Sequence, residues 1–240
     1  MAKSSGMGHQ LLLSGYVLSN DIQSLSRIGG GPNNPLDFTG IDVSAMERKG
    51  GLLDAVIDLT AFFNPAAARA HARLGALPRT EQLVSYLAGT TLGDPAACLL
   101  AKQVNYDGTR GQDGSLMFNA NNQGGSGYPL EWGEQLTAGV RTDTEATNGS
   151  SIDYGASTAL GGVGYLHVTA FTGTSVAVTI EDSPDDSAWS TLLTFTAATG
   201  ITFERIETGA TDTVDQYVRA ITTGTFSDAQ FNVTFVRRLA

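Results

Sequence analysis

Ala55 to Phe63 read AVIDLTAFF, and apolar and polar side chains alternate along this stretch. A period of two is typical of a β-strand that buries one of its faces. The apolar face consists of Ile57, Leu59, Ala61 and Phe63. Asp58 and Thr60 occupy the other face, so this strand has one side for a core and one side for a polar environment.

A short helix is predicted directly after this strand. Asn64 suits the N-cap position, and Pro65 suits the first helical position because it needs no backbone N–H there. We expect the helix to run to about Leu77 and to end before Pro78. Its apolar side consists of Ala67, Ala70, Leu74 and Leu77.

Short alternating runs separated by turn residues predict further strands on both sides of the chain's midpoint. In the first part we expect them at Gln82 to Leu87, Ala96 to Tyr106, Ser115 to Asn121 and Tyr128 to Thr137. In the last of these, Leu130, Trp132 and Leu136 fall on one face. In the second part we expect them at Val163 to Phe171, Val176 to Glu181, Thr191 to Phe195, Thr202 to Glu207, Gln216 to Thr222 and Gln230 to Arg237.

The composition suits two β-rich domains. The chain has 240 residues, of which 41% are hydrophobic and 16% charged, so it can build a core. Threonine divides it, with 9 among the first 145 residues and 18 among the last 95. We therefore predict a mainly β fold: residues 1–145 form a β-sandwich or barrel domain with one short helix, and residues 146–240 form a C-terminal β-sandwich.

Charge and cysteine content limit the function. The formal net charge of −10 disfavours tight nucleic-acid binding, because that binding depends on Lys and Arg at phosphates. A single cysteine, Cys98, cannot form an internal disulfide, and its apolar neighbours predict a buried strand. No run approaches the ~20 apolar residues of a membrane span. We expect a protein that folds in the cytosol without a membrane step.

No constellation for catalysis, cofactor binding or metal binding is recognisable. His9, His71 and His167 are not at metal-ligand spacing from one another or from the cysteine. No G-x-S-x-G motif supports a serine nucleophile, and the glycine-rich stretches lack the residues of a phosphate loop. The acidic cluster from Glu181 to Asp186 does not have EF-hand spacing, so we expect a hairpin turn there. The chain is predicted not to be an enzyme.

Three glycine-rich segments are predicted to be long loops: Gly29 to Asp37, Asp107 to Gly114 and Asn121 to Gly127. Loops of this length on a compact domain are commonly functional or form interfaces. Flexible linkage is the alternative interpretation, and the sequence does not separate the two.

The segment GLLDAVIDLTAFF (Gly51 to Phe63) resembles a stretch found in major tail proteins of phages with long, non-contractile tails. As in that family, it follows a short Asp-x-Ser segment with basic residues (Asp42 to Lys49) and precedes a helix. The C-terminal segments VTIEDSPDDSAW (Val178 to Trp189), FERI and QYVRA resemble those of such proteins from phages of actinobacteria. The resemblance covers the chain from about Leu36 onward, and residues 1–35 have no match.

This resemblance implies a structural subunit of the virion tail, assembled in the host cytoplasm. Six subunits would form a ring, each lending strands to an inner β-barrel, and the rings would stack into a tube. The tube would hold the tape-measure protein, end at tail terminator and distal tail proteins, and conduct genomic DNA during ejection without binding it specifically. The C-terminal sandwich would lie on the exterior.

Particular residues follow from this interpretation. Asp58, Thr60, Glu131 and Gln135 are the candidate lumen-facing side chains, and a negative lumen would repel phosphates. Residues in the glycine-rich segments are the candidates for contacts between rings. These are Gly29, Gly30, Gly31, Asn33, Asn34, Asp107, Gly108, Gly111, Gly124 and Gly125.

Three alternatives remain open. A tube protein of a contractile tail or of a secretion apparatus belongs to the same structural class. A carbohydrate-binding or adhesin-type virion protein would explain the C-terminal sandwich but not the first domain. An uncharacterised hydrolase is disfavoured because no histidine-centred constellation is present.

Overall fold

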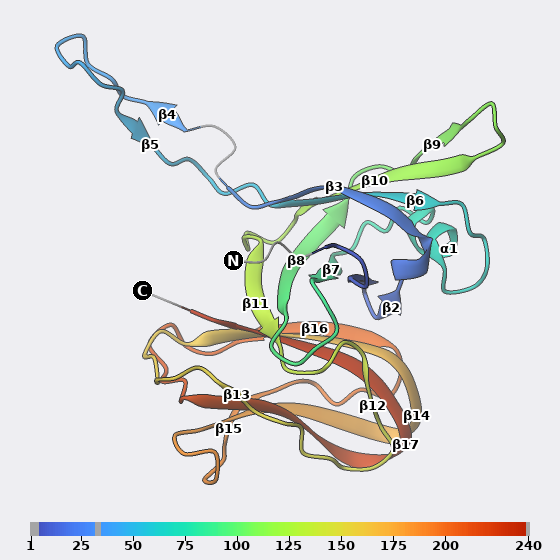
Figure 1. The fold of residues 1–240 in the computed structure, drawn as a ribbon, viewed down its shortest axis with the longest axis vertical. Coiled ribbons are helices and arrows are strands. Elements are labelled where there is room, and N and C mark those ends of the chain that lie inside the picture. The colour runs from blue at the N-terminus through green and yellow to red at the C-terminus, as the bar shows by residue number, and fades with distance from the viewer. Residues whose placement is uncertain (1–4, 32–34, 239–240) are drawn as a thin grey trace.

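The computed structural model describes residues 5–31 and 35–238 and has two stacked β-rich halves (Figure 1). The N-terminal half, blue to green, carries the short helix, and the C-terminal half, yellow to red, is a sandwich of longer strands. The predicted fold class, mainly β with one short α-helix and a C-terminal sandwich, is confirmed. No helix within the described ranges is long and apolar enough to cross a membrane.

The N-terminal half is built on antiparallel strands. Its main elements are β1 (Gln10–Leu13), β2 (Tyr16–Val17), β3 (Ile22–Gly29), β6 (Val56–Phe62), β7 (Gln82–Leu87), β8 (Pro95–Gln103), β10 (Leu116–Gly124) and β11 (Glu131–Gln135). A 3₁₀ turn, η1 (Ser19–Asp21), lies between β2 and β3. The pairing order β3–β6–β10–β8–β7–β1 brings the inner faces together around Ile57, Leu59, Leu74, Val84 and Leu99. The predicted strands at β6 and β7 are confirmed, whereas β1, β2 and β3 were not anticipated.

The helix is shorter than predicted. α1 contains only Ala70–Leu74, because Ala68 has a φ of 61° and Leu77 a φ of 44°, neither of which a right-handed helix allows. The N-terminus of α1 is held by a distant side chain, since Asp21 accepts hydrogen bonds from the Ala70 N–H (3.0 Å) and from Asn64 Nδ2 (2.8 Å). Asn64 therefore anchors the segment before the helix instead of capping it.

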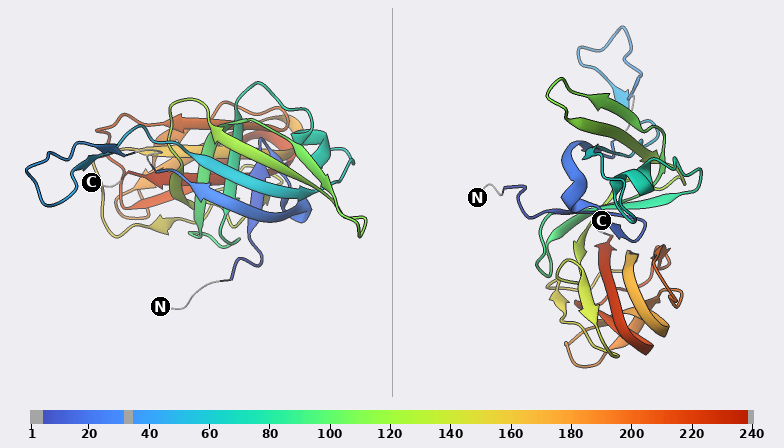
Figure 2. Two further views of the ribbon diagram at one scale, coloured as in Figure 1. Left: turned by 90° about the horizontal axis from the view of Figure 1, so that it is seen from above. Right: turned by 90° about the vertical axis from the view of Figure 1, so that its right-hand side faces the viewer.

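Two hairpins leave the N-terminal half at opposite ends (Figure 2, left). The first is the arm, residues 30–31 and 35–54, whose strands β4 (Leu36–Asp37) and β5 (Arg48–Lys49) pair with each other and with no other described strand. The second consists of β9 (Asp107–Arg110) and the start of β10. The predicted loop at Asp107 to Gly114 is thus mostly strand and turn, and β10 continues to Gly124 where a loop from Asn121 was predicted.

The C-terminal half depends on two very long strands. Its elements are β12 (Arg141–Asp143), β13 (Ile152–Asp153), β14 (Gly162–Ser183), β15 (Ser190–Thr194), β16 (Thr202–Glu207) and β17 (Tyr217–Arg237). β14 pairs with β17 along nearly its whole length, so four predicted strands are in fact two. Bends replace the predicted breaks, at Gly173 (φ 153°) and Gly224 (φ 124°). A Cβ at Gly224 would lie 2.3 Å from the Ser175 carbonyl oxygen, so this close approach requires glycine.

The bent pair encloses the second core. Its largest fully buried side chains include Phe195, Phe231 and Phe235. The turn between β14 and β15 uses Asp185 as predicted, because its carboxylate accepts hydrogen bonds from the backbone N–H groups of Ser187 and Ala188. These hydrogen bonds lower the pKa of Asp185 to about 2.

One continuous sheet joins the two halves. β11 pairs with β8 on one side and with β17 on the other. Tyr165 and Arg205 of the C-terminal half hydrogen-bond to Glu131 on β11, and the Arg205–Glu131 contact is 3.0 Å. The halves are therefore connected by backbone pairing and by a nearly buried ion pair.

Candidate functional site

The outer face of the sheet formed by β3, β6 and β10 is a polar surface. Strand register places Arg27 and Asn121 on either side of Asp58, and Ser24 and Asn119 on either side of Thr60. Thr60 Oγ1 donates a hydrogen bond of 2.8 Å to Asn119 Oδ1. Since the side chains of Ile57, Leu59 and Ala61 fill the core beneath, alternation along β6 directs its polar residues outward.

This face carries both signs of charge. Arg27 and Lys102 are exposed here, as is Asp107 at the start of β9. Asp58 Oδ1 is buried under its neighbours and has no hydrogen-bond partner among the described residues. The surface is therefore rich in amides and hydroxyls with few charges, whereas a negative lumen was predicted.

Two strands of this sheet have a free edge. β3 is the last strand on one side; on the other side of β10 the sheet continues through β8, while β9 pairs only with the first part of β10. An edge strand presents unpaired N–H and C=O groups that can pair with another chain. Each of these two edges can therefore take up a further strand.

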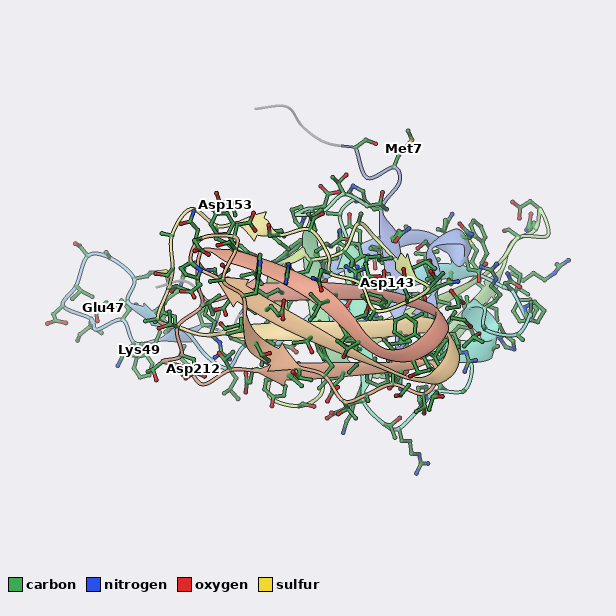
Figure 3. The ribbon with its side chains drawn as sticks, turned by 90° about the horizontal axis from the view of Figure 1, so that it is seen from below. Met7, Glu47, Lys49, Asp143, Asp153 and Asp212 are labelled. Carbon is green, nitrogen blue, oxygen red and sulfur yellow. The ribbon has the colours of Figure 1, made fainter. Side chains whose placement is uncertain are left out.

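The arm exposes an unusual number of apolar side chains. Seven large apolar residues lie on it at 40% exposure or more: Leu36, Phe38, Ile41, Val43, Met46, Leu52 and Leu53. Ile41 is fully exposed and Leu52 is 92% exposed. Figure 3 shows Glu47 and Lys49 on this arm, clear of the sandwich that carries Asp143 and Asp153. Contact with water is unfavourable for apolar side chains. An extended hairpin that exposes seven of them is therefore typical of a surface that packs against a partner.

The arm also has local structure of its own. Asp37 Oδ1 accepts hydrogen bonds from the Thr39 N–H (2.9 Å) and hydroxyl (2.5 Å), which lowers the pKa of Asp37. The Thr39 hydroxyl in turn accepts the Glu47 N–H at 2.9 Å. Lys49 Nζ lies 5.0 Å from the centre of the Phe38 ring. These contacts fix the hairpin shape while its apolar side chains stay outside.

The opposite hairpin stands on an aromatic base. Phe63, His71, Tyr106 and Phe118 pack together, and the Tyr106 and Phe118 rings stack at 4.4 Å between centroids. Phe63 is itself 38% exposed, and chain neighbours of the cluster are also exposed and apolar: Phe62, Leu77 and Val104. The molecule thus has a second apolar surface, at the end remote from the arm.

The four candidate lumen residues do not form one surface. Asp58 and Thr60 lie on the outer face of β6, where a lumen role stays a prediction. Glu131 is nearly buried in its ion pair with Arg205. Gln135 is fully buried, with Nε2 donating to the Gly89 carbonyl oxygen at 3.1 Å. Those two predictions are wrong for this conformation, because β11 is an interior strand between β8 and β17. The predicted apolar face of this strand is also wrong, since Trp132 is exposed.

The candidate inter-ring residues fall on both hairpins. Gly29 ends β3, and Gly30 and Gly31 begin the arm, while Asn33 and Asn34 lie outside the described residues. Asp107 and Gly108 belong to β9, Gly111 to its turn, Gly124 to the end of β10, and Gly125 follows it. Sequence reasoning found the hairpins through their glycines but missed the apolar residues of the arm. Their signal was a set of large apolar residues without any period in a stretch rich in Gly, Pro and Asp.

A buried polar cluster between the halves does not have the character of a catalytic site. The Gly15 N–H donates to His167 Nδ1 at 3.1 Å, so Nε2 carries the proton and donates to Ser85 Oγ at 2.8 Å. Ser85 donates to Cys98 Sγ at 3.2 Å. Burial raises the pKa of Cys98 to about 12 and lowers that of His167 to about 3. All three side chains are closed to solvent, so the cluster joins the two halves.

Elsewhere in the described part of the chain, no group of three His, Cys, Asp or Glu side chains could hold a metal ion. The candidate site is therefore a surface: the outer face of β3–β6–β10, its two edges, the arm and the aromatic base.

Neither a protein-family model nor a curated protein sequence matches the chain. Among solved structures, it is similar to the Dit protein of SPP1, described as a paradigm of the hub adsorption apparatus in phages that infect Gram-positive bacteria. The identity is 11% and the TM-score 0.34, over 96% of this chain and 99% of that one. It is also similar to chains of the phage p2 baseplate in its activated conformation with Sr (9% identity, TM-score 0.38, 96% of this chain and 98% of that chain). A third similarity is to the p2 baseplate with Ca (10%, 0.35, 97% and 99%). Because these TM-scores lie below 0.5, the likeness carries no conclusion about function.

Proposed function

We propose that this chain is a structural subunit of a bacteriophage tail, that copies of it join into a ring through the β3–β6–β10 sheet, and that rings stack into a tail tube. The observation that carries the proposal is the placement of the arm and the aromatic base at opposite ends of one sheet with two free edges. In a lone subunit the free strand edges and the apolar side chains stay exposed, and contacts with further copies of the chain would cover them.

The contacts required are heterologous. A free edge at β3 and another at β9 are different surfaces, so pairing one with the other adds subunits in one rotational direction. Such a series closes into a ring when the rotation per subunit divides a full turn, and closure removes every exposed edge. The number of subunits, six by the resemblance in sequence, is part of the proposal.

The arm supplies the second contact. Its seven exposed apolar residues need a partner surface, and the apolar surroundings of the aromatic base are available on every other copy. An arm that extends away from the sheet suits a contact with an adjacent ring, which would make rings stack into a tube.

The polar face then becomes the inner wall. Amide and hydroxyl side chains such as Asn119, Asn121 and Thr60 keep water at the surface, and only Arg27 and Lys102 offer charges to phosphates. Together with the net charge of −10, this wall would let DNA pass without holding it. The tape-measure protein, tail terminator and distal tail proteins are the further partners that this role implies, and no catalytic activity is expected.

The test is size-exclusion chromatography of the full chain over a range of concentrations, followed by negative-stain electron microscopy of each peak. Hollow tubes of stacked rings are expected at high concentration. Rings that never stack would point to a single ring at the end of a tail and would contradict the tube. A monomer at every concentration, also after addition of preformed tail tips, would contradict the proposal as a whole.

A further inference from the structure

A small cavity of about 240 Å³ opens where β8, β11 and β17 meet, away from the surfaces used above. Trp132 and Glu134 reach it from β11, Pro95 from β8 and Arg237 from β17, and Tyr154 follows β13. Sites for drug-sized ligands measure roughly 300–1,000 Å³. This cavity has room for one ring of a larger ligand.

Trp132 is largely open to solvent. Its side chain is 53% exposed although it lies in the middle of a paired strand. The other tryptophan, Trp189, is covered by the Arg219 guanidinium at 3.9 Å from the ring centre, and Arg219 is itself paired with Glu181. The chain thus satisfies one tryptophan internally and leaves the other open to solvent.

The polar groups around Trp132 lack partners. Glu134 lies on the same strand face, two residues on; its carboxylate lies beside the Tyr154 hydroxyl and makes no ion pair within the described ranges. Arg237 lies 5.0 Å from the centre of the Tyr154 ring and donates one hydrogen bond to the Ala156 carbonyl oxygen. Its Nε atom and the Tyr154 hydroxyl have no partner there. One acid and one base therefore line the cavity, and within the described residues they do not form an ion pair with each other.

Tyr154 keeps the site polar without adding charge. Burial raises its pKa, and the neighbouring Glu134 carboxylate raises it further, so the hydroxyl stays protonated. The oxygens of the Glu134 carboxylate can accept hydrogen bonds from a ligand.

This combination selects a chemical class. A phosphate would face Glu134, and a quaternary ammonium would face Arg237, so the cavity disfavours either charge. A neutral ring with apolar faces and hydroxyl edges matches every group: its face packs on an aromatic ring, a carboxylate accepts from its hydroxyls, and a guanidinium donates to them. We propose that this cavity binds one pyranose ring of a neutral glycan, with Trp132 as the stacking platform and Glu134 and Arg237 as the hydroxyl-binding pair. This inference goes beyond the proposed assembly role and does not depend on it.

The two tryptophans make a direct test possible. In the Trp189→Phe variant, Trp132 is the sole tryptophan, and its fluorescence is followed while glucose, galactose, mannose, rhamnose or N-acetylglucosamine is added. At least one sugar should give a saturable change, with a Kd of about 1–10 mM, as suits a single small ring. The converse variant, Trp132→Phe, should give a flat response because its remaining tryptophan is distant from the cavity.

Side-chain specificity is tested in the Trp189→Phe background. Glu134→Gln should weaken binding about tenfold, because it removes a charge-assisted acceptor while keeping the shape. Glu145→Gln, an exposed carboxylate outside the cavity, is the matched control and should not change the Kd. Thermal unfolding of each variant shows that it is folded.

Any one of four results would overturn the inference. No sugar of the panel changes the Trp132 signal, or the change persists in Trp132→Phe, or the Glu145→Gln control loses as much affinity as Glu134→Gln. Shielding of Trp132 from acrylamide in assembled rings would also overturn it, because the cavity would then be a contact between copies.

Discussion

The two halves of the molecule differ in how many large apolar side chains they leave exposed to solvent. Of the 15 large apolar side chains that are exposed in the described part of the chain, 14 precede residue 146 and only Ile201 follows it. The C-terminal half buries its apolar residues inside the sandwich formed by the bent strands β14 and β17. The N-terminal half leaves its apolar residues on a projecting arm and around an aromatic base.

The strands show a weaker contrast. β14 and β17 pair over nearly their whole lengths, and β15, β16, β12 and β13 add to them. In the N-terminal half, β3 is the last strand of the continuous sheet and β9 pairs only with β10, so both leave a free edge; the C-terminal half has edge strands of its own in β15 and β16. Since exposed apolar groups favour association, we expect the N-terminal half to make the contacts between copies and the C-terminal half to fold without them.

Substitutions in the arm should have the largest effect on assembly. The double substitution Phe38→Ser and Ile41→Ser removes two exposed apolar anchors without touching either core. If each contributes about 2 kcal/mol to a contact between copies, each loss weakens that contact about 30-fold, and tubes should disappear. Electron microscopy and size-exclusion chromatography measure this effect, and the thermal unfolding of the monomer should be unchanged.

The matched control for the arm is Ile201→Ser in the C-terminal half, which is 46% exposed. It should leave assembly intact. If the control abolished tubes and the arm variant did not, the assignment of assembly to the N-terminal half would be wrong.

The junction between the halves gives the next largest effect. Glu131→Ala leaves the Arg205 guanidinium, only 5% exposed, without its nearest carboxylate. Loss of one partner of a buried pair costs about 3–5 kcal/mol, and we expect the lower end because Glu207 remains 3.1 Å from Arg205. Urea unfolding should show it, whereas Arg238→Ala, in a surface pair, should cost less than about 1 kcal/mol. Equal costs would show that Glu131 does not join the halves.

Acid should weaken the same junction through His167. Because its folded-state pKa is depressed to about 3, the unfolded chain takes up the proton first as the pH falls below about 6.5. The stability contributed by the neutral ring is present above that pH and is lost towards pH 3. We expect about 2 kcal/mol less stability at pH 5 than at pH 7.5 from this group. In His167→Gln the difference between the two pH values should shrink by that amount, and an unchanged pH dependence would contradict the assignment.

The sequence pattern predicted those elements that depend on residues close together in the chain. The local pattern of apolar and turn residues predicted β6, β7 and β16 closely, and alternation identified the buried face of β6. It failed where long-range pairing decides: Gly173 and Gly224 appeared to separate strands, but the chain bends there and pairing continues. Glu131 could not be placed for the same reason, since its partner Arg205 is 74 residues away. Asp58 and Thr60 were placed correctly on an outward face because the period of a single strand fixes it.

The smallest perturbation tests whether that outward face lines a lumen. Thr60→Cys puts a thiol on the outer face of β6 at a cost of less than about 0.5 kcal/mol, as for most surface substitutions. The native Cys98 is buried with its pKa raised to about 12, so it does not compete for maleimides. In the monomer, the thiol at position 60 should react with N-ethylmaleimide and with a maleimide carrying a large polyethylene glycol chain. In assembled tubes the small reagent should still react and the large one should not, because it cannot enter the lumen. Thr199→Cys, on an exposed loop of the C-terminal half, should react with both in tubes. Reaction of position 60 with the large reagent in intact tubes would place the polar face on the outside and exclude it as the wall along which DNA passes.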